Sequence, residues 1–138
     1  MDQARSLDLF RLSGHAAMVT GAARGLGRAM ALALADAGAD IVAVDAGPMD
    51  GLAEEVEKLG VGCVQLEADL SELDPTTARD VIDRGRECFA AIDILVNNAG
   101  MIRRGPALET TTEDWSRVIG LNLTTPFFSA PDLRAVTC

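Results

Sequence analysis

The chain has 138 residues, of which 49% are hydrophobic and 24% charged, a length and composition suited to one globular domain. Its formal net charge of −9 argues against a nucleic acid partner, because phosphate binding needs clustered lysines and arginines. No apolar run reaches the roughly 18 residues of a membrane span and no signal peptide is visible, so we expect a cytoplasmic protein without a membrane partner.

The first elements alternate between strand and helix. Residues 16–20 form a compact apolar run, typical of a buried strand, and glycines follow it directly. Residues 28–37 are rich in Ala and Leu, which predicts a helix packed on a sheet, and Gly38 stands where a helix commonly ends. Residues 41–44 are β-branched and continuously apolar, as in a parallel strand that is buried on both faces.

The same alternation continues to the end of the chain. Leu52, Val56 and Leu59 share one face of a short helix that Gly60 ends, and a strand is predicted over residues 61–66. Asp74 and Pro75 are typical of the N-cap and first position of a helix. The apolar stripe of this helix comprises Ala78, Val81, Ile82, Cys88, Phe89 and Ile92, and a fourth strand is predicted over residues 94–96. Thr111 or Thr112 caps a last helix, whose apolar side comprises Trp115, Val118, Ile119 and Leu123.

This order of elements predicts an α/β fold. Strands that alternate with helices pair in parallel through right-handed crossovers, which gives a Rossmann-like doubly wound sheet. We expect residues 1–138 to form a single domain with about four strands. The three cysteines have unrelated spacings, so no metal site is expected, and Cys63 and Cys88 are expected to be buried thiols.

The turn after the first strand reads TGAARGLG, residues 20–27. Gly21 can adopt a turn conformation closed to other residues, Gly25 lets the backbone approach a pyrophosphate, and Gly27 lets the helix pack close to the strand. Amide groups at the start of the helix, including those near Arg24 and Leu26, would face the phosphates. A purely structural glycine turn is the alternative, but the strand before it and the helix after it favour nucleotide binding.

Asp45, at the end of the second strand, supports the nucleotide interpretation. A carboxylate at this position can accept hydrogen bonds from the adenosine ribose hydroxyls and would repel a 2′-phosphate, so we expect NAD rather than NADP. Arg24 argues in the other direction, because an arginine in the loop could bind a 2′-phosphate. The alternative role of Asp45 is a helix cap or a turn residue.

The glycine loop together with NNAG, residues 97–100, resembles the short-chain dehydrogenase/reductase family. Asp69-Leu70 after the third strand and Asn122 in the last helix fit the same pattern. The resemblance covers about residues 10–130. Within the family, the stretch NAGMIRRGPALETTTEDW and the lead-in LFRLSG look most like the sugar-acid members, the 2-deoxygluconate and 2-dehydro-3-deoxygluconate dehydrogenases.

The resemblance implies particular roles for the matching residues. Asp69 and Leu70 would hold the adenine ring, and Asn98, Ala99 and Gly100 would line the cofactor groove, with Asn98 also able to brace the sheet. The alternative for Asn97-Asn98 is a simple turn.

Asn122 and the Arg103-Arg104 pair each have a functional and a structural interpretation. Asn122 matches the catalytic helix asparagine that holds a proton-relay water in the family, and the alternative is an asparagine that distorts the helix by bonding the backbone. Arg103 and Arg104 are either a solvated pair or a group that binds the carboxylate of a sugar-acid substrate.

The catalytic half of the family pattern is missing. The resemblance implies a Tyr general acid/base, a nearby Lys that lowers its pKa, and a Ser that orients the substrate carbonyl. This sequence contains no tyrosine, its only lysine is Lys58, and no serine follows Ser129. Pro131 disfavours helix at the preceding residue. We therefore expect residues 1–138 to be a single, incomplete dinucleotide-binding Rossmann domain, truncated after about four strands, with residues 130–138 as a divergent tail. Such a truncated or frameshifted chain is expected to be inactive alone.

The function expected from these observations is an NAD(P)-dependent oxidoreductase that acts on a small-molecule substrate, with a sugar-acid alcohol or ketone as the candidate. The alternative is a non-catalytic NAD-binding or regulatory module. The family tends to form homo-oligomers. A phosphate-accepting receiver domain would need a lysine after Asp69, and a P-loop NTPase would need the GK[S/T] sequence; both are absent.

Overall fold

The computed structural model describes residues 8–72 and 75–130. Its core is a four-stranded parallel sheet in the order β3-β2-β1-β4. The strands are β1 (Ala16–Thr20), β2 (Asp40–Asp45), β3 (Cys63–Glu67) and β4 (Ile94–Val96). The order of neighbours reverses between β1 and β4, which is the switch point at which open α/β sheets bind ligands. The predicted α/β Rossmann-like fold is therefore confirmed.

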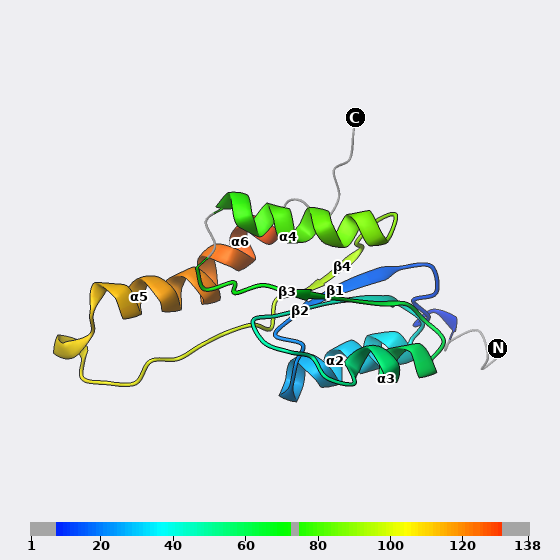
Figure 1. Cartoon of the computed structure of the whole chain (residues 1–138), viewed down its shortest axis with the longest axis horizontal. Coiled ribbons are helices and arrows are strands. Elements are labelled where there is room, and N and C mark those ends of the chain that lie inside the picture. The colour runs from blue at the N-terminus through cyan, green and yellow to red at the C-terminus, as the bar shows by residue number, and fades with distance from the viewer. Residues whose placement is uncertain (1–7, 73–74, 131–138) are drawn as a thin grey trace.

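Helices cover both faces of this sheet (Figure 1). The helices α2 (Gly25–Asp36) and α3 (Leu52–Lys58) lie on one face, and α4 (Pro75–Cys88) lies on the other. After β4 a long loop leads through a 3₁₀ turn, η1 (Ala107–Glu109), to α5 (Thr112–Ile119), which projects away from the sheet. A π-helical segment, η2 (Gly120–Thr124), joins α5 to α6 (Thr125–Ser129), and α6 returns to pack beside α4.

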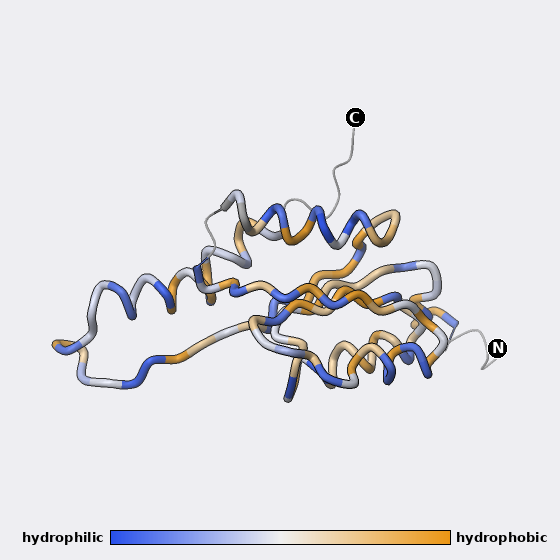
Figure 2. Tube along the Cα trace, in the orientation of Figure 1, coloured by the Kyte–Doolittle hydropathy of each residue, from blue (hydrophilic) through white to orange (hydrophobic). Residues whose placement is uncertain are grey.

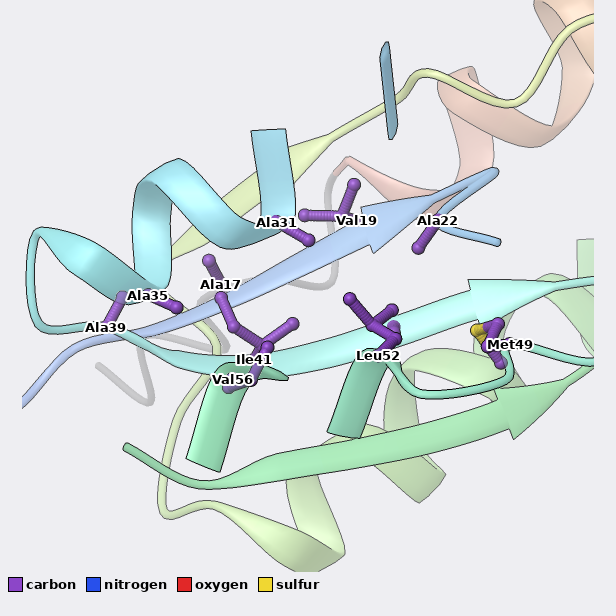
Figure 3. Packing of buried hydrophobic residues seen from close by; sticks show 11 residues of the cluster. Ala17, Val19, Ala22, Ala31, Ala35, Ala39, Ile41, Met49, Leu52 and Val56 are labelled. Atoms are coloured by element: carbon purple, nitrogen blue, oxygen red, sulfur yellow. The ribbon is translucent and has the colours of Figure 1, made fainter. Parts of the chain in front are cut away.

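The continuous apolar runs of the strands supply both cores, because successive side chains point to opposite faces. Ala17, Val19, Ile41 and Ala43 face α2 and α3, where they pack on Ala31, Ala35, Leu52 and Val56 (Figure 3). Met18, Val42 and Val44 point the other way, toward Val81, Ile82 and Ile92. The centre of the sheet is accordingly coloured mostly toward the hydrophobic end of the scale (Figure 2).

Gly85 shows why a residue with poor helix propensity stands in the middle of α4. A Cβ atom at this position would lie 2.7 Å from Cε of Met18 and 2.9 Å from Cδ1 of Ile92. The close approach of α4 to β1 therefore compensates for the roughly 1 kcal/mol of helix propensity that glycine loses against alanine.

Several expected details are wrong. The helix expected over residues 28–37 begins earlier, at Gly25, and the strand expected from residue 61 begins at Cys63. Cys88, in the last turn of α4, is exposed, and Cys63, on the edge strand β3, is half-buried. The last helix is interrupted by the π-helical segment, and its expected apolar side is only partly covered: Val118 and Ile119 are half-buried, whereas Trp115 and Leu123 are each 61% exposed.

Some expectations fall on parts of the chain that are not described. The N-cap at Asp74 and the tail from Pro131 to Cys138 lie outside the described residues. Thr111 is the cap of α5, because its hydroxyl oxygen accepts from the amide of Asp114 at 3.1 Å. None of the helices within residues 8–72 and 75–130 combines the length and apolar character needed to cross a bilayer.

Candidate functional site

A cleft of about 460 Å³ opens at the carboxyl ends of the four strands. Ten of the residues predicted to bind a cofactor line it: Gly21, Arg24, Gly25, Leu26, Asp45, Asp69, Leu70, Asn98, Ala99 and Gly100. The predicted Gly27 and Asn122 are not in its lining. Three lining residues were not predicted, namely Ala46, Ala68 and Leu121. Ala46 and Ala68 adjoin predicted strand ends, but no sequence signal points to Leu121, which comes from η2.

The glycine loop forms one wall of the cleft and leaves the start of α2 open. Gly21 and Gly25 have φ values of +69° and +56°, which side chains strongly disfavour. A Cβ atom on Gly27 would overlap the carbonyl oxygen of Gly21 and lie 2.6 Å from Nδ2 of Asn98. The side chain of the N-cap residue, Arg24, makes no capping hydrogen bond, so first-turn amides of α2 can receive an anion.

Asp45 stands at the end of β2 with its carboxylate held by two backbone amides. Ala23 donates to Oδ2 at 2.9 Å and Gly47 donates to Oδ1 at 3.2 Å. These bonds orient the carboxylate between the glycine loop and the loop after β2. The turn role considered for Asp45 is thus present, and the same carboxylate also borders the cleft.

Asp69 follows β3 on the opposite side of the cleft. Hydrogen bonds from the hydroxyl and the amide of Ser71 to Oδ1, at 2.7 and 2.9 Å, hold the pKa of this carboxyl below its usual value. The carboxylate is therefore ionised at neutral pH and can only accept hydrogen bonds. Among the described residues Oδ2 has no hydrogen-bond partner, and Leu70 beside it is 6% exposed and belongs mostly to the core.

Thr20 and Asn98 join the glycine loop to the end of β4. The Thr20 hydroxyl accepts from the amides of Asn98 and Ala99 at 3.1 and 3.0 Å and donates to the carbonyl of Val96 at 3.3 Å. Nδ2 of Asn98 donates to the carbonyls of Thr20 and Gly21. A simple turn therefore does not account for Asn98, because its side chain connects the end of β4 to the end of β1. The role of the Thr20 hydroxyl was missed, because its partners lie far away in the sequence.

Asn122 clamps the loop that follows Gly100. Its Oδ1 accepts from the amide of Met101 and its Nδ2 donates to the carbonyl of the same residue, each at 2.9 Å. The side chain thus bonds backbone, but the backbone of another segment rather than of its own helix. Both ends of the amide are occupied by Met101, so the side chain positions the cleft margin at Gly100.

Replacing Asn122 with aspartate is expected to loosen this loop. The second carboxylate oxygen would face the Met101 carbonyl without a proton between them, which should cost about 1 kcal/mol of unfolding free energy at this exposed site. Faster hydrogen exchange at the Met101 amide, with a matching loss in chemical denaturation, would be the evidence. Asn97→Asp is the control, since that exposed side chain has no hydrogen bond to any described residue.

Arg103 and Arg104 lie outside the cleft. They line a separate hollow of about 170 Å³ together with Pro106, Glu109 and Asp114. Nε of Arg103 lies 3.4 Å from Oδ1 of Asp114, and both side chains are about half exposed. Both arginines are exposed, as in the solvated-pair interpretation, and Arg103 also pairs with Asp114 at the surface.

The titratable groups that remain do not form a metal centre. Among the described residues, no group of three or more His, Cys, Asp or Glu side chains is placed to hold a metal ion. Burial, followed by the charges of Glu57 and Glu54, raises the pKa of Cys63 to about 11. That thiol is protonated at neutral pH and is not a nucleophile.

Comparison with known proteins gives one consistent result. The family model described as short chain dehydrogenase matches residues 15–133. The 2-dehydro-3-deoxy-D-gluconate 5-dehydrogenase of Escherichia coli (strain K12) is 46% identical over 122 residues, which are 88% of this chain and 47% of that protein. The chain thus spans about half the length of the curated relatives it matches.

Solved structures of dehydrogenases are also similar to this chain. A crystal structure from Agrobacterium tumefaciens, described as a 2-deoxy-D-gluconate 3-dehydrogenase with bound NADP, is 40% identical with a TM-score of 0.75, covering 88% of this chain and 47% of that one. The carveol dehydrogenase of Mycobacterium avium in complex with NAD is 31% identical with a TM-score of 0.77, covering 88% of this chain and 48% of that one.

Proposed function

Because the chain belongs to the short-chain dehydrogenase family, we propose that its cleft binds the adenosine diphosphate part of a nicotinamide dinucleotide, in an oxidoreductase that acts on a sugar acid. The observation that carries the proposal is the start of α2. The first turn of α2 contains Gly25 and Gly27 and has no side-chain cap. It opens into the cleft between the carboxylates of Asp45 and Asp69.

The residues of the cleft suit the parts of this ligand. The first-turn amides of α2 would donate to the diphosphate, where the helix dipole also favours negative charge. The carboxylate of Asp45 would accept from the ribose hydroxyls, and the free Oδ2 of Asp69 would accept from the adenine amino group. The bound nicotinamide would supply the hydride acceptor or donor of the reaction.

The sugar-acid substrate rests on the relatives named above, which include a 2-dehydro-3-deoxy-D-gluconate 5-dehydrogenase. Proton transfer to or from such a substrate needs a general acid/base, and the sequence holds no tyrosine. Lys58 ends α3 at the edge of the sheet where β3 begins, opposite the cleft. We therefore propose that these 138 residues bind the dinucleotide without turning substrate over.

The choice between NAD and NADP has support on both sides. Asp45 favours NAD, because its carboxylate would lie against a 2′-phosphate, and the carveol dehydrogenase was solved with NAD. The structure from Agrobacterium tumefaciens holds NADP, and the side chain of Arg24, which borders this cleft, has no ion pair with any described residue. We propose a preference for NAD that Arg24 limits.

Titration calorimetry of this chain with ADP-ribose, NAD⁺ and NADP⁺ tests the proposal. We expect saturable binding of ADP-ribose and NAD⁺, and no formation of NADH when 2-dehydro-3-deoxygluconate or gluconate is supplied as the redox partner. Absence of binding by all three nucleotides would contradict the assignment of the cleft. NADH formation by this chain alone would contradict the account of its missing acid/base.

A further inference from the structure

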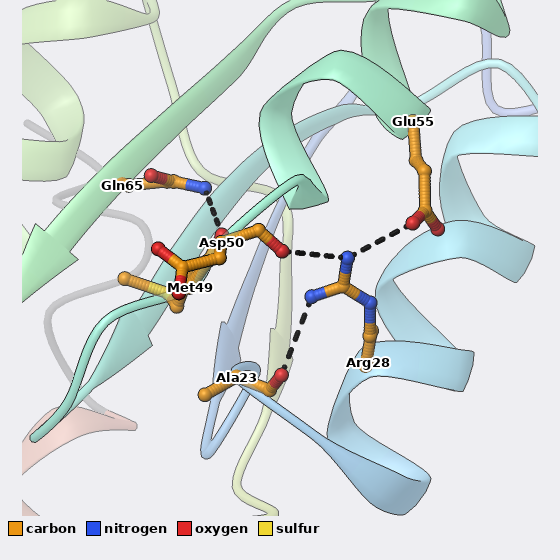
Figure 4. A network of polar contacts seen from close by, with 6 residues as sticks. All are labelled: Ala23, Arg28, Met49, Asp50, Glu55 and Gln65. Carbon is orange, nitrogen blue, oxygen red and sulfur yellow. Dashed lines mark hydrogen bonds and ion pairs between the residues drawn. The ribbon is translucent and has the colours of Figure 1, made fainter.

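Arg28, one turn into α2, donates three side-chain hydrogen bonds to described residues. Its Nη1 donates to the carbonyl of Ala23 at 3.3 Å, and its Nη2 donates to the carbonyl of Asp50 and to Oε1 of Glu55, both at 3.0 Å (Figure 4). The side chain is 22% exposed and lies between α2, the glycine loop and the start of α3. It does not line the cleft.

The two carbonyls that Arg28 binds belong to the two segments that hold Asp45. The backbone N–H of Ala23 donates to Oδ2 of Asp45, and the backbone carbonyl of Ala23 accepts from Arg28. On the other side, the loop from Asp45 to Asp50 donates through Gly47 to Oδ1 of Asp45 and ends at the carbonyl bound by Arg28. Arg28 therefore ties together both loops whose amides fix the carboxylate.

A second bond supports the same loop from β3. Nε2 of Gln65 donates to the carbonyl of Met49 at 2.8 Å, directly before Asp50 (Figure 4). Gln65 holds this loop to the sheet, whereas Arg28 connects it to the glycine loop from the side of α2. The planar guanidinium can reach two carbonyls and a carboxylate at once, which a single ammonium group on a lysine does with poorer geometry.

We propose that Arg28 is a positioning residue that sets the orientation of the Asp45 carboxylate, and through it the discrimination between NAD and NADP. The inference rests on the proposed function, because it assigns the ribose of the dinucleotide to Asp45. Without Arg28, the glycine loop and the loop after β2 can separate, and the carboxylate loses its fixed direction toward the ribose. Discrimination against a 2′-phosphate then falls, although Asp45 itself is unchanged.

Three variants test this inference: Arg28→Met, Arg28→Lys and the control Arg86→Met. Arg86 pairs with Asp83 at 3.4 Å on α4, which covers the other face of the sheet. Two quantities are measured for each: hydrogen exchange of the Ala23 and Gly47 amides without ligand, and the affinities for NAD⁺ and NADP⁺. Thermal unfolding of each variant reports any global loss of structure.

For Arg28→Met we expect the exchange rates of the Ala23 and Gly47 amides to increase by about tenfold. This factor corresponds to the net stabilisation by about one hydrogen bond at each amide. The ratio of the NAD⁺ to the NADP⁺ affinity should fall by about fivefold to tenfold on the same argument. Arg28→Lys should recover part of both effects, and Arg86→Met should show neither. Unchanged amide exchange, or an equal loss of affinity for the two dinucleotides, would overturn the inference.

Failure of the proposed function gives a different pattern. If the unmodified chain binds neither dinucleotide, the cofactor assignment is wrong and the claim about discrimination is wrong with it. The amide exchange of Ala23 and Gly47 then still decides whether Arg28 holds the carboxylate of Asp45.

Discussion

Replacing Gly27 with alanine is expected to abolish dinucleotide binding and to destabilise the chain by about 2–3 kcal/mol. The added methyl group would overlap the carbonyl oxygen of Gly21, a backbone atom that cannot rotate away, and would crowd Nδ2 of Asn98. Alanine gains at most about 1 kcal/mol of helix propensity over glycine, so the steric cost prevails. Relief of the overlap would move the start of α2 away from the loop and disrupt the anion site.

Chemical denaturation and titration calorimetry with ADP-ribose measure the two effects. Gly105→Ala is the matched control, because a Cβ atom there would have no neighbour within 4 Å and its backbone conformation is open to alanine. That variant should stay within about 0.5 kcal/mol of the parent chain. A Gly27→Ala protein of unchanged stability and affinity would show that the glycine is not needed for close packing.

Replacing Asp45 with asparagine is expected to reverse the balance between the two dinucleotides. The amide keeps an acceptor for only one of the two backbone N–H groups that hold Asp45, and it removes the charge. Two unit charges 4 Å apart at a protein surface interact by about 4 kcal/mol. Part of that repulsion is screened, so we expect NADP⁺ to gain about tenfold or more relative to NAD⁺. Competition of the two dinucleotides with labelled ADP-ribose would give the ratio directly.

Arg24→Gln is the opposing variant. Its side chain lines the same cleft, and removal of its charge should weaken NADP⁺ while leaving NAD⁺ almost unchanged. Both ratios should shift less at high salt, because the charges are near the surface. If Asp45→Asn weakens the two dinucleotides equally, then the carboxylate serves the loop and not the ribose.

Much of the fold and of the cleft could be read from local patterns in the sequence. The strand β1 and the end of β2 at Asp45 follow from continuous apolar runs, and the positive φ of Gly21 follows from the need for glycine in a tight strand-to-helix turn. Because parallel strands bring their carboxyl ends to one edge, Asp45, Asp69 and Asn98 could be expected to border one cleft.

Other features depended on which distant segments meet. Leu121 enters the cleft wall from η2, Asn122 pairs with Met101 and not with its own helix, and the Thr20 hydroxyl binds amides beyond β4. From the sequence alone Arg28 is an ordinary surface residue of α2, because its partner, the carbonyl of Asp50, lies in a loop that only the fold brings beside it. A residue's own neighbours along the chain determine its backbone geometry and its apolar face, whereas the partner of a polar side chain is decided only when the sheet order and the crossovers bring remote backbone groups within hydrogen-bond distance.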